Sequence, residues 1–287
     1  MWYLIASISC TTILGVFFKV FPKYSIDRIT AVIINYLSCS VIGLFFFMAQ
    51  YSSSNESFQN TSWLPSAIIL GAFFILGFNF FGKSIEFNGL AISSTIQKMS
   101  IIVSVVVAIV LGDNVVFLQI VGLFLAILSI FLLSLNFGAV QDKIKNKKFL
   151  FLAWIMAIGI EVIFISLYKF TSLNSIEKMS FTLGIFFFAF LFGIMQYRSK
   201  IKWTDKNSVG FGIALGIPNY FSIISLNYSL QSGIPGSVVF PVLNCAVIFL
   251  SILVSYIFFK EKISFFQWIG LVLALVAIGL ISYFQNN

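Results

Sequence analysis

The sequence predicts an all-α integral membrane protein, with ten transmembrane helices in two five-helix inverted repeats. The chain of 287 residues is 60% hydrophobic and 9% charged, with a mean hydropathy of +1.06. Average soluble domains carry about 25% charged residues, so this composition indicates a membrane protein. The apolar runs are long enough to cross a bilayer as helices, which takes about 20 residues, and they lack the alternating polarity of barrel strands. A sequence duplication predicts the repeats.

The ten helices follow from ten apolar runs that are separated by polar connections. We expect them at residues 2–21, 28–49, 63–85, 89–111, 115–136, 148–170, 177–197, 208–231, 234–259 and 264–284. The second and seventh helices have matching start signals, Ser-Ile-Asp-Arg at 25–28 and Ser-Ile-Glu-Lys at 175–178, with a serine near the N-cap and an acid in the first turn. The longest connections are about a dozen residues each, which excludes a linked ATPase, kinase or DNA-binding domain.

The duplication relates the two halves of the chain, residues 1–137 and 148–287. Gly89, at the start of the fourth run, matches Gly233, which is 144 residues later. In the fifth run Gly122 matches Gly270 at an offset of 148, so the second copy has four extra residues, about one helical turn. Because each copy has five helices, the second copy enters the membrane from the opposite face. Inverted repeats of this kind are typical of transporters that work by alternating access.

Several kinds of chemistry are excluded by composition. The chain has no histidine, and its three cysteines, Cys10, Cys39 and Cys245, each lie inside an apolar run. A His/Cys metal site and a Ser-His-Asp triad are therefore excluded, and a structural disulfide is not expected. The sequence has no P-loop motif, so an ATP site is not expected either. We expect no cofactor, no metal and no enzymatic activity.

The basic residues predict the orientation in the membrane. Loops that follow odd-numbered helices hold fourteen of them, the opposite face holds only Lys169 and Lys178, and Lys98 lies within a span. The fourteen are Lys19, Lys23, Arg28, Lys83, Lys143, Lys145, Lys147, Lys148, Arg198, Lys200, Lys202, Lys206, Lys260 and Lys262. By the positive-inside rule both termini lie outside the cytoplasm, and the compact form favours a bacterial inner membrane. The net charge of +8 is therefore not interpreted as a nucleic-acid footprint.

The second half carries motifs that resemble the EamA repeat of the drug/metabolite transporter superfamily. The motifs are Glu261-Lys262, Gln267, Gly270 and Gly279, with Pro241 about twenty residues before the glutamate. A weaker copy in the first half has Asp113, Gln119 and Gly122. The resemblance implies a ten-helix inverted-repeat fold in which helices 1–4 and 6–9 surround a central cavity. It also implies a secondary carrier or exchanger that exports amino acids or other metabolites, or carries sugar phosphates or nucleotide sugars. The lysine in the fourth helix departs from the family pattern.

Two charged residues lie near the predicted midplane, where a charge costs several kcal/mol without a partner or water. Lys98 is nine residues into the run 89–111, and Glu161 is near the middle of the sixth. In one interpretation they form an ion pair that only fixes helix packing. In the other, both face a watery cavity, where Lys98 attracts a carboxylate or phosphate and Glu161 holds Lys98 or takes up a proton. Gln97 is adjacent, and Ser100 matches Asn244 at the offset of 144, which makes all of these candidates for substrate binding.

Other polar and kinking residues complete the candidate site. We expect Asn35, Tyr36, Asn219 and Asn227 either to join helices by hydrogen bonds or to line the cavity. Pro218 and Pro241 interrupt helices, and Pro235 and Gly236 lie at the entry to the ninth helix, so we expect these four to act in gating.

The sequence thus predicts a secondary transporter, an exporter or exchanger, of a small polar metabolite with an anionic or amino-acid-like structure. Its expected partners are that substrate, the bilayer and a proton as coupling ion, with no nucleic acid. The alternatives are a flippase for a lipid-linked substrate and a non-transporting membrane scaffold.

Overall fold

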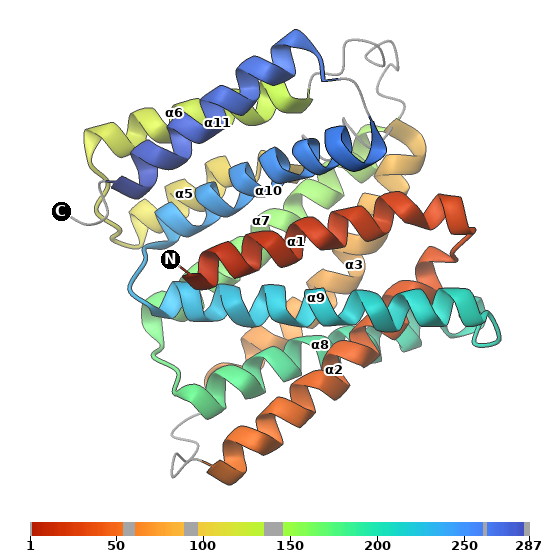
Figure 1. Ribbon diagram of the computed structural model, residues 1–287. Coiled ribbons are helices and arrows are strands. Elements are labelled where there is room, and N and C mark those ends of the chain that lie inside the picture. The colour runs from red at the N-terminus through yellow and green to blue at the C-terminus, as the bar shows by residue number, and fades with distance from the viewer. Residues whose placement is uncertain (1, 54–60, 89–96, 135–145, 261–262, 284–287) are drawn as a thin grey trace. The chain divides into compact units, whose positions relative to one another are not determined.

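The protein is all-α over the part of the chain that its computed structural model describes, residues 2–53, 61–88, 97–134, 146–260 and 263–283. The helices, in chain order (Figure 1), are α1 (Trp2–Val20), α2 (Arg28–Ser53), α3 (Leu64–Asn88), α5 (Ile101–Val110), α6 (Phe117–Ser134), α7 (Lys147–Phe170), α8 (Ser175–Tyr197), α9 (Lys206–Gln231), α10 (Gly236–Phe259) and α11 (Phe265–Tyr283). Two short 3₁₀ turns, η1 (Phe21–Tyr24) and η2 (Arg198–Lys200), follow α1 and α8.

Most of these helices are long and apolar enough to span a membrane. Seven meet this criterion, and three further apolar helices of 10–17 residues are Trp2–Phe18, Ile101–Val110 and Phe117–Leu133. The prediction of an all-helical, multi-pass membrane protein is therefore confirmed. The number of ten crossings stays a prediction, because the three shorter helices do not establish crossings by themselves. Several predicted residues, including Gly89, Lys143, Lys145, Glu261 and Lys262, lie outside the described residues.

The fourth predicted helix, 89–111, is not continuous. Gln97 and Lys98 are helical, a turn follows, and α5 begins only at Ile101. At this turn the Ser100 N–H donates to the Gln97 carbonyl at 3.2 Å, a spacing of three residues in place of the α-helical four. The prediction of one uninterrupted helix was wrong here: the polar residues Gln97 and Lys98, which lie just before the turn, were assigned to the same continuous apolar run.

The chain forms two compact units. Unit 1 is Met1–Ile75 with Leu167–Ser232, and it contains α1, α2, α8 and α9. Unit 2 is Leu76–Ser166 with Gly233–Asn287, and it contains α5, α6, α10 and α11. The division falls within α3 and within α7. Each unit therefore combines helices from both halves of the sequence, so the units do not coincide with the predicted repeats 1–137 and 148–287.

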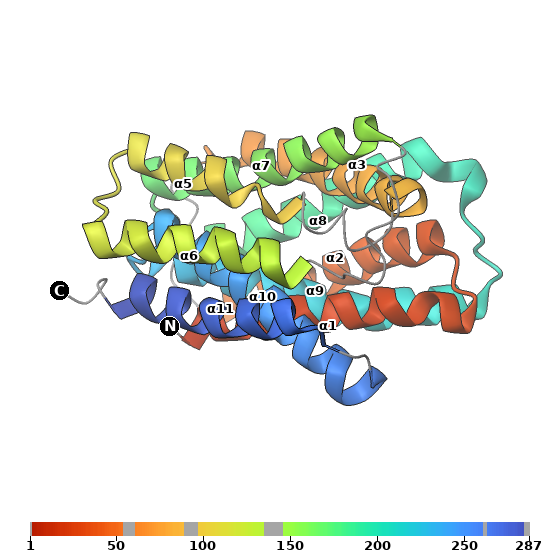
Figure 2. The same ribbon diagram turned by 90° about the horizontal axis from the view of Figure 1, so that it is seen from above.

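Unit 1 is built on close contacts between α2 and its neighbours α8 and α9. A methyl group at Gly212 of α9 would lie 2.6 Å from the Ala31 carbonyl oxygen of α2, and one at Gly193 of α8 would lie 3.3 Å from Ile33. Small residues allow this approach of two backbones, as is common between membrane helices. Helix α1 lies alongside α9 in both views (Figure 1 and Figure 2), and the Ser7 hydroxyl donates to the Ser222 carbonyl across that contact at 2.9 Å.

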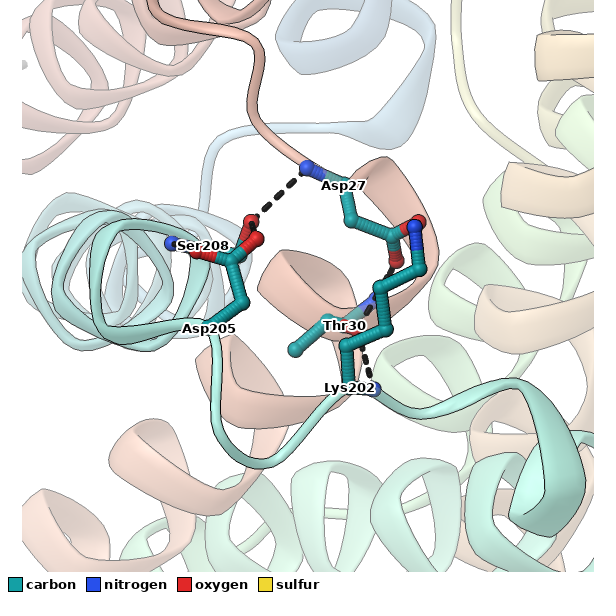
Figure 3. Close-up of polar contacts among 5 residues, drawn as sticks. All are labelled: Asp27, Thr30, Lys202, Asp205 and Ser208. Atoms are coloured by element: carbon teal, nitrogen blue, oxygen red, sulfur yellow. Dashed lines mark hydrogen bonds and ion pairs between the residues drawn. The ribbon is translucent and has the colours of Figure 1, made fainter.

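A polar cluster joins the α1–α2 turn to the α8–α9 loop at one end of unit 1 (Figure 3). The Asp27 carboxylate accepts from the Thr30 N–H at 2.9 Å and forms an ion pair with Lys202 at 3.4 Å. The Asp27 N–H donates to the Ser208 hydroxyl at 2.7 Å, and that hydroxyl donates to Asp205 at 2.6 Å. The two connections, 181 residues apart, therefore lie at the same end of the unit.

Side-chain hydrogen bonds identify the residues that cap α2 and α8. Asp27 caps α2 through Thr30, whereas Ser25 has a φ of +52° and is not the cap. Asn174 caps α8 and forms a capping box with Glu177. Burial acts to raise the pKa of Asp27, but the hydrogen bonds from Thr30 and the contact with Lys202 outweigh it, so that the pKa lies below its usual value.

Unit 2 contains an antiparallel pair, α6 and α11, which lie side by side in both views (Figure 1 and Figure 2). A methyl group at Gly122 of α6 would lie 2.8 Å from Ile281 of α11, and one at Gly270 of α11 would lie 2.9 Å from Leu133 of α6. At the offset of 148, Gly122 matches Gly270 and Leu133 matches Ile281. The contact is therefore reciprocal, as in a two-fold interface.

The first turns of α6 and α11 also match. The Val116 N–H donates to the Gln119 side-chain carbonyl at 3.0 Å, and the Ser264 N–H donates to that of Gln267 at 2.9 Å. Both pairs are related by the same offset of 148. The Gln267 amide also donates to the Leu133 carbonyl at 3.1 Å, which ties the start of α11 to the end of α6.

Candidate functional site

Unit 2 holds a buried cluster of polar side chains around Glu161, which α7 places near its middle. The Glu161 side chain is 8% exposed and accepts three hydrogen bonds from two other helices. Ser100 donates to Oε1 at 3.1 Å, the Asn244 amide of α10 donates to the same oxygen at 2.9 Å, and Ser104 donates to Oε2. Ser104 Oγ also lies 3.2 Å from the Ser100 carbonyl in its own helix. A carboxylate with several donors can stay ionised in an apolar setting.

Lys98 joins the cluster through Asn244. Its ammonium donates to the Asn244 side-chain oxygen Oδ1 at 2.9 Å. The described contacts do not include a direct ion pair between Lys98 and Glu161, so the amide bridges the two charges. The sequence correctly placed the two charges near one another, but a direct Lys98–Glu161 pair, which one interpretation required, was wrong.

Two residues of this cluster are related by the predicted repeat offset. Ser100 and Asn244, which match at the offset of 144, donate to the same oxygen of Glu161. Lys98 matches Val242, which is a buried apolar residue of α10. The lysine therefore has no charged counterpart at the matching position of the second half. Such an asymmetric cluster suits a ligand that is itself asymmetric.

The remaining predicted residues of this region have smaller roles in the described contacts. Gln97 is partly buried, and its backbone carbonyl accepts from the Ser100 N–H. Ser104 was missed by the sequence analysis. It lies one helical turn after Ser100, on the same face of the helix, and that spacing of four residues is the signal that could have found it.

The other predicted binding residues belong to unit 1. There the Asn219 amide donates to the Asn35 side-chain oxygen at 3.2 Å, which joins α9 to α2. The Asn227 amide donates to Thr182 of α8 at 2.7 Å, and the Asn227 oxygen is buried with no hydrogen-bond partner among the described residues. Tyr36 is buried, with its ring 6.3 Å from that of Phe186. These residues join the helices of unit 1, and the structure does not place them in one cluster with Lys98.

The predicted gating residues lie at kinks and at a helix start. Pro218 is inside α9 and Pro241 is inside α10, as predicted. The Pro235 carbonyl accepts from the Val238 and Val239 N–H groups, and α10 begins at the next residue. A methyl group at Gly236 would lie 2.9 Å from Ile165 of α7, so this glycine is needed for close packing. Their part in gating stays a prediction.

The comparisons with known proteins agree with a transporter fold. Residues 146–283 match the family model described as the EamA-like transporter family. An uncharacterized protein of Haemophilus influenzae is 26% identical over 298 residues, which cover 100% of this chain and 99% of that protein. A solved protein crystal structure has a similar fold, with a TM-score of 0.79 and 11% identity over 99% of each chain.

Proposed function

We propose that this membrane protein is a secondary active transporter of a small polar metabolite, a proposal supported by the match of residues 146–283 to the EamA-like transporter family model. The resemblance inferred from the sequence motifs is confirmed by that match, which fits the drug/metabolite transporter superfamily. The observation that carries the substrate class is the buried Lys98–Asn244–Glu161 cluster. A lysine held within a polar cluster between apolar helices is suited to an anionic or amino-acid-like substrate.

We infer that the chain crosses the membrane ten times as two inverted repeats. Three contacts join connections that should share a membrane face in such a chain: Asp27 with Ser208, Asp113 with Ser237, and Leu133 with Gln267. The reciprocal packing of α6 against α11 supports the same two-fold relation. Inverted repeats allow one substrate site to open first to one side and then to the other.

The loop charges support the proposed orientation, with both termini on the non-cytoplasmic side, since fourteen basic residues are expected on the other face. The compact ten-span form supports a bacterial inner membrane as the location. Reporter fusions at Asn287 test the orientation. A C-terminal fusion that is active only in the cytoplasm would contradict it, without affecting the carrier function.

In this function Lys98 binds a carboxylate or phosphate of the substrate. Glu161 either holds Lys98 in place or takes up a proton during the cycle. The kinks at Pro218 and Pro241 and the α10 entry at Pro235 and Gly236 are where we expect bending during gating. The polar residues of unit 1, Asn35, Tyr36, Asn219 and Asn227, complete the candidate binding residues.

The test is transport in proteoliposomes with a panel of labelled carboxylates, amino acids and phosphate esters. Lys98→Ala should abolish transport of the anionic substrate that the panel identifies, while the protein still folds and inserts. Lys206→Ala, which removes an exposed lysine at the start of α9, is the matched control and should leave transport unchanged. Equal transport by Lys98→Ala and wild type would refute the assignment of Lys98.

The other functions predict different results. A flippase would require a lipid-linked substrate, and a scaffold would transport none of the panel in either direction. Transport of a free metabolite excludes both. A double variant of Lys98 and Glu161 to apolar residues that regains full transport would show that the charges serve only packing.

A further inference from the structure

The Asn244 amide has an orientation that its two neighbours determine. An ammonium can only donate hydrogen bonds and an ionised carboxylate can only accept them. The Asn244 oxygen must therefore face Lys98 and its NH₂ must face Glu161, as the distances of 2.9 Å and 2.9 Å show. Asparagine and glutamine are the side chains that present both a donor and an acceptor in this way without carrying a charge.

The contacts of Glu161 suit the ionised form. Its two oxygens face three donors, from Ser100, Ser104 and Asn244. A neutral acid would bring a fourth donor into this group; the amide nitrogen of Asn244 does not accept, so a serine hydroxyl would have to turn its own proton away from Glu161. The ionised carboxylate, by contrast, uses all three donors without rearrangement.

Glu161 and Lys98 differ in their access to a ligand. The residues that enclose the carboxylate are almost fully buried, with Asn244 at 2% exposure and Ser100 and Ser104 at 1% each. Lys98 is only partly buried. Its ammonium has three N–H donors, of which the described contacts use one, for Asn244. A ligand bound to the other donors of Lys98 would not displace any donor of Glu161.

We propose that Asn244 is a positioning residue that links Lys98 to Glu161, and that Glu161 is a fixed counter-charge and not a proton carrier. The linkage holds the lysine ammonium charged, with donors other than the one used by Asn244 toward a carboxylate or phosphate group. The identity of that ligand rests on the proposed function, whereas the linkage itself does not.

The linkage is tested on the purified full-length protein in lipid nanodiscs, without any substrate. Trace acylation with acetic anhydride modifies only neutral amines, and mass spectrometry of the peptides measures the extent at Lys98 relative to the exposed Lys206. Glu161→Gln keeps the size of the side chain and removes its charge. Asn244→Leu removes both hydrogen bonds of the bridge.

Both variants should raise acylation of Lys98 at a fixed pH, by about tenfold or more, because a hydrogen bond to a charged group typically contributes enough for that change. Asn244→Asp should not raise it, because the new carboxylate pairs directly with the ammonium. The control is Gln267→Leu, which removes a bridging amide of the same unit that bonds Leu133 and Ser264, and it should match the wild type.

Three results would overturn the proposal. Acylation of Lys98 that rises in Asn244→Leu but not in Glu161→Gln would show that the amide only shields the lysine. Equal acylation in the Asp and Leu variants of Asn244 would show that its polarity is irrelevant. An infrared carboxylic-acid band that titrates between about pH 5 and pH 8 and is absent in Glu161→Gln would show that Glu161 exchanges a proton. A protein that passes these tests but transports nothing would refute the proposed function and leave the linkage intact.

Discussion

Replacing Glu161 by leucine should be one of the most destabilising single changes in unit 2. The change removes the acceptor of three hydrogen bonds and leaves the charge of Lys98 without its counter-charge. Ser104 can turn to the Ser100 carbonyl, which is already 3.2 Å away, so that donor finds another partner. The Ser100 and Asn244 donors remain buried without one.

The expected loss in the free energy of unfolding follows from these two donors, which lose their acceptor. Each hydrogen bond to a charged group contributes about 1.5–3 kcal/mol, which gives a loss of about 3–6 kcal/mol. Removing one member of a buried charged pair costs about 3–5 kcal/mol, in the same range. We therefore expect Glu161→Leu to lower the free energy of unfolding by about 3–5 kcal/mol. Ser104→Ala should cost less, about 1.5 kcal/mol, because it removes one hydrogen bond and Glu161 keeps the donors of Ser100 and Asn244.

The assay is denaturant unfolding of the protein in mixed detergent micelles, monitored by helical ellipticity. Wild type, Glu161→Leu and Ser104→Ala are compared in the same micelles. If Glu161→Leu unfolds within about 1 kcal/mol of the wild type, or if Ser104→Ala costs as much, the argument that the donors depend on this carboxylate is refuted. The double variant with Lys98→Met should recover part of the loss, because it removes the stranded charge.

The remaining predictions concern the α6–α11 contact and the cluster at the end of unit 1. Gly122→Val and Gly270→Val should each cost about 1–3 kcal/mol in the same unfolding assay, because their new side chains would meet Ile281 and Leu133. Gly279→Ala on α11, where a methyl group meets nothing within 4 Å, is the control and should be neutral or stabilising. Since the pKa of Asp27 is lowered in the folded protein, its ionised form stabilises the fold above the unfolded value of about 3.9. This contribution is lost as the pH falls through the folded pKa, so the stability difference between wild type and Asp27→Ala should shrink in acid. A difference that grows as the pH falls would contradict the lowered pKa.

Much of the fold was predictable from the sequence because lipid-spanning helices leave a local signal. The ends of α7, at Lys147 and Phe170, lie within one residue of the predicted run 148–170. The predicted repeat offset relates Gly122 to Gly270, and both glycines lie at close contacts between α6 and α11, where packing depends on small residues. The break before α5 was missed because the polar residues Gln97, Lys98 and Ser100 were interpreted as side chains of one continuous span.

The charges at Lys98 and Glu161 were identifiable from the sequence alone, because an ionisable residue inside an apolar run is costly wherever it packs. Their relation was decided only by the tertiary structure, which brings α5, α7 and α10 together and puts Asn244 between the charges. The division into units that mix both halves of the chain was likewise a tertiary outcome. Hydropathy indicates which segments can span the membrane as helices. The pairing of those helices depends on side-chain shape and hydrogen-bond direction, which act between segments far apart in the sequence.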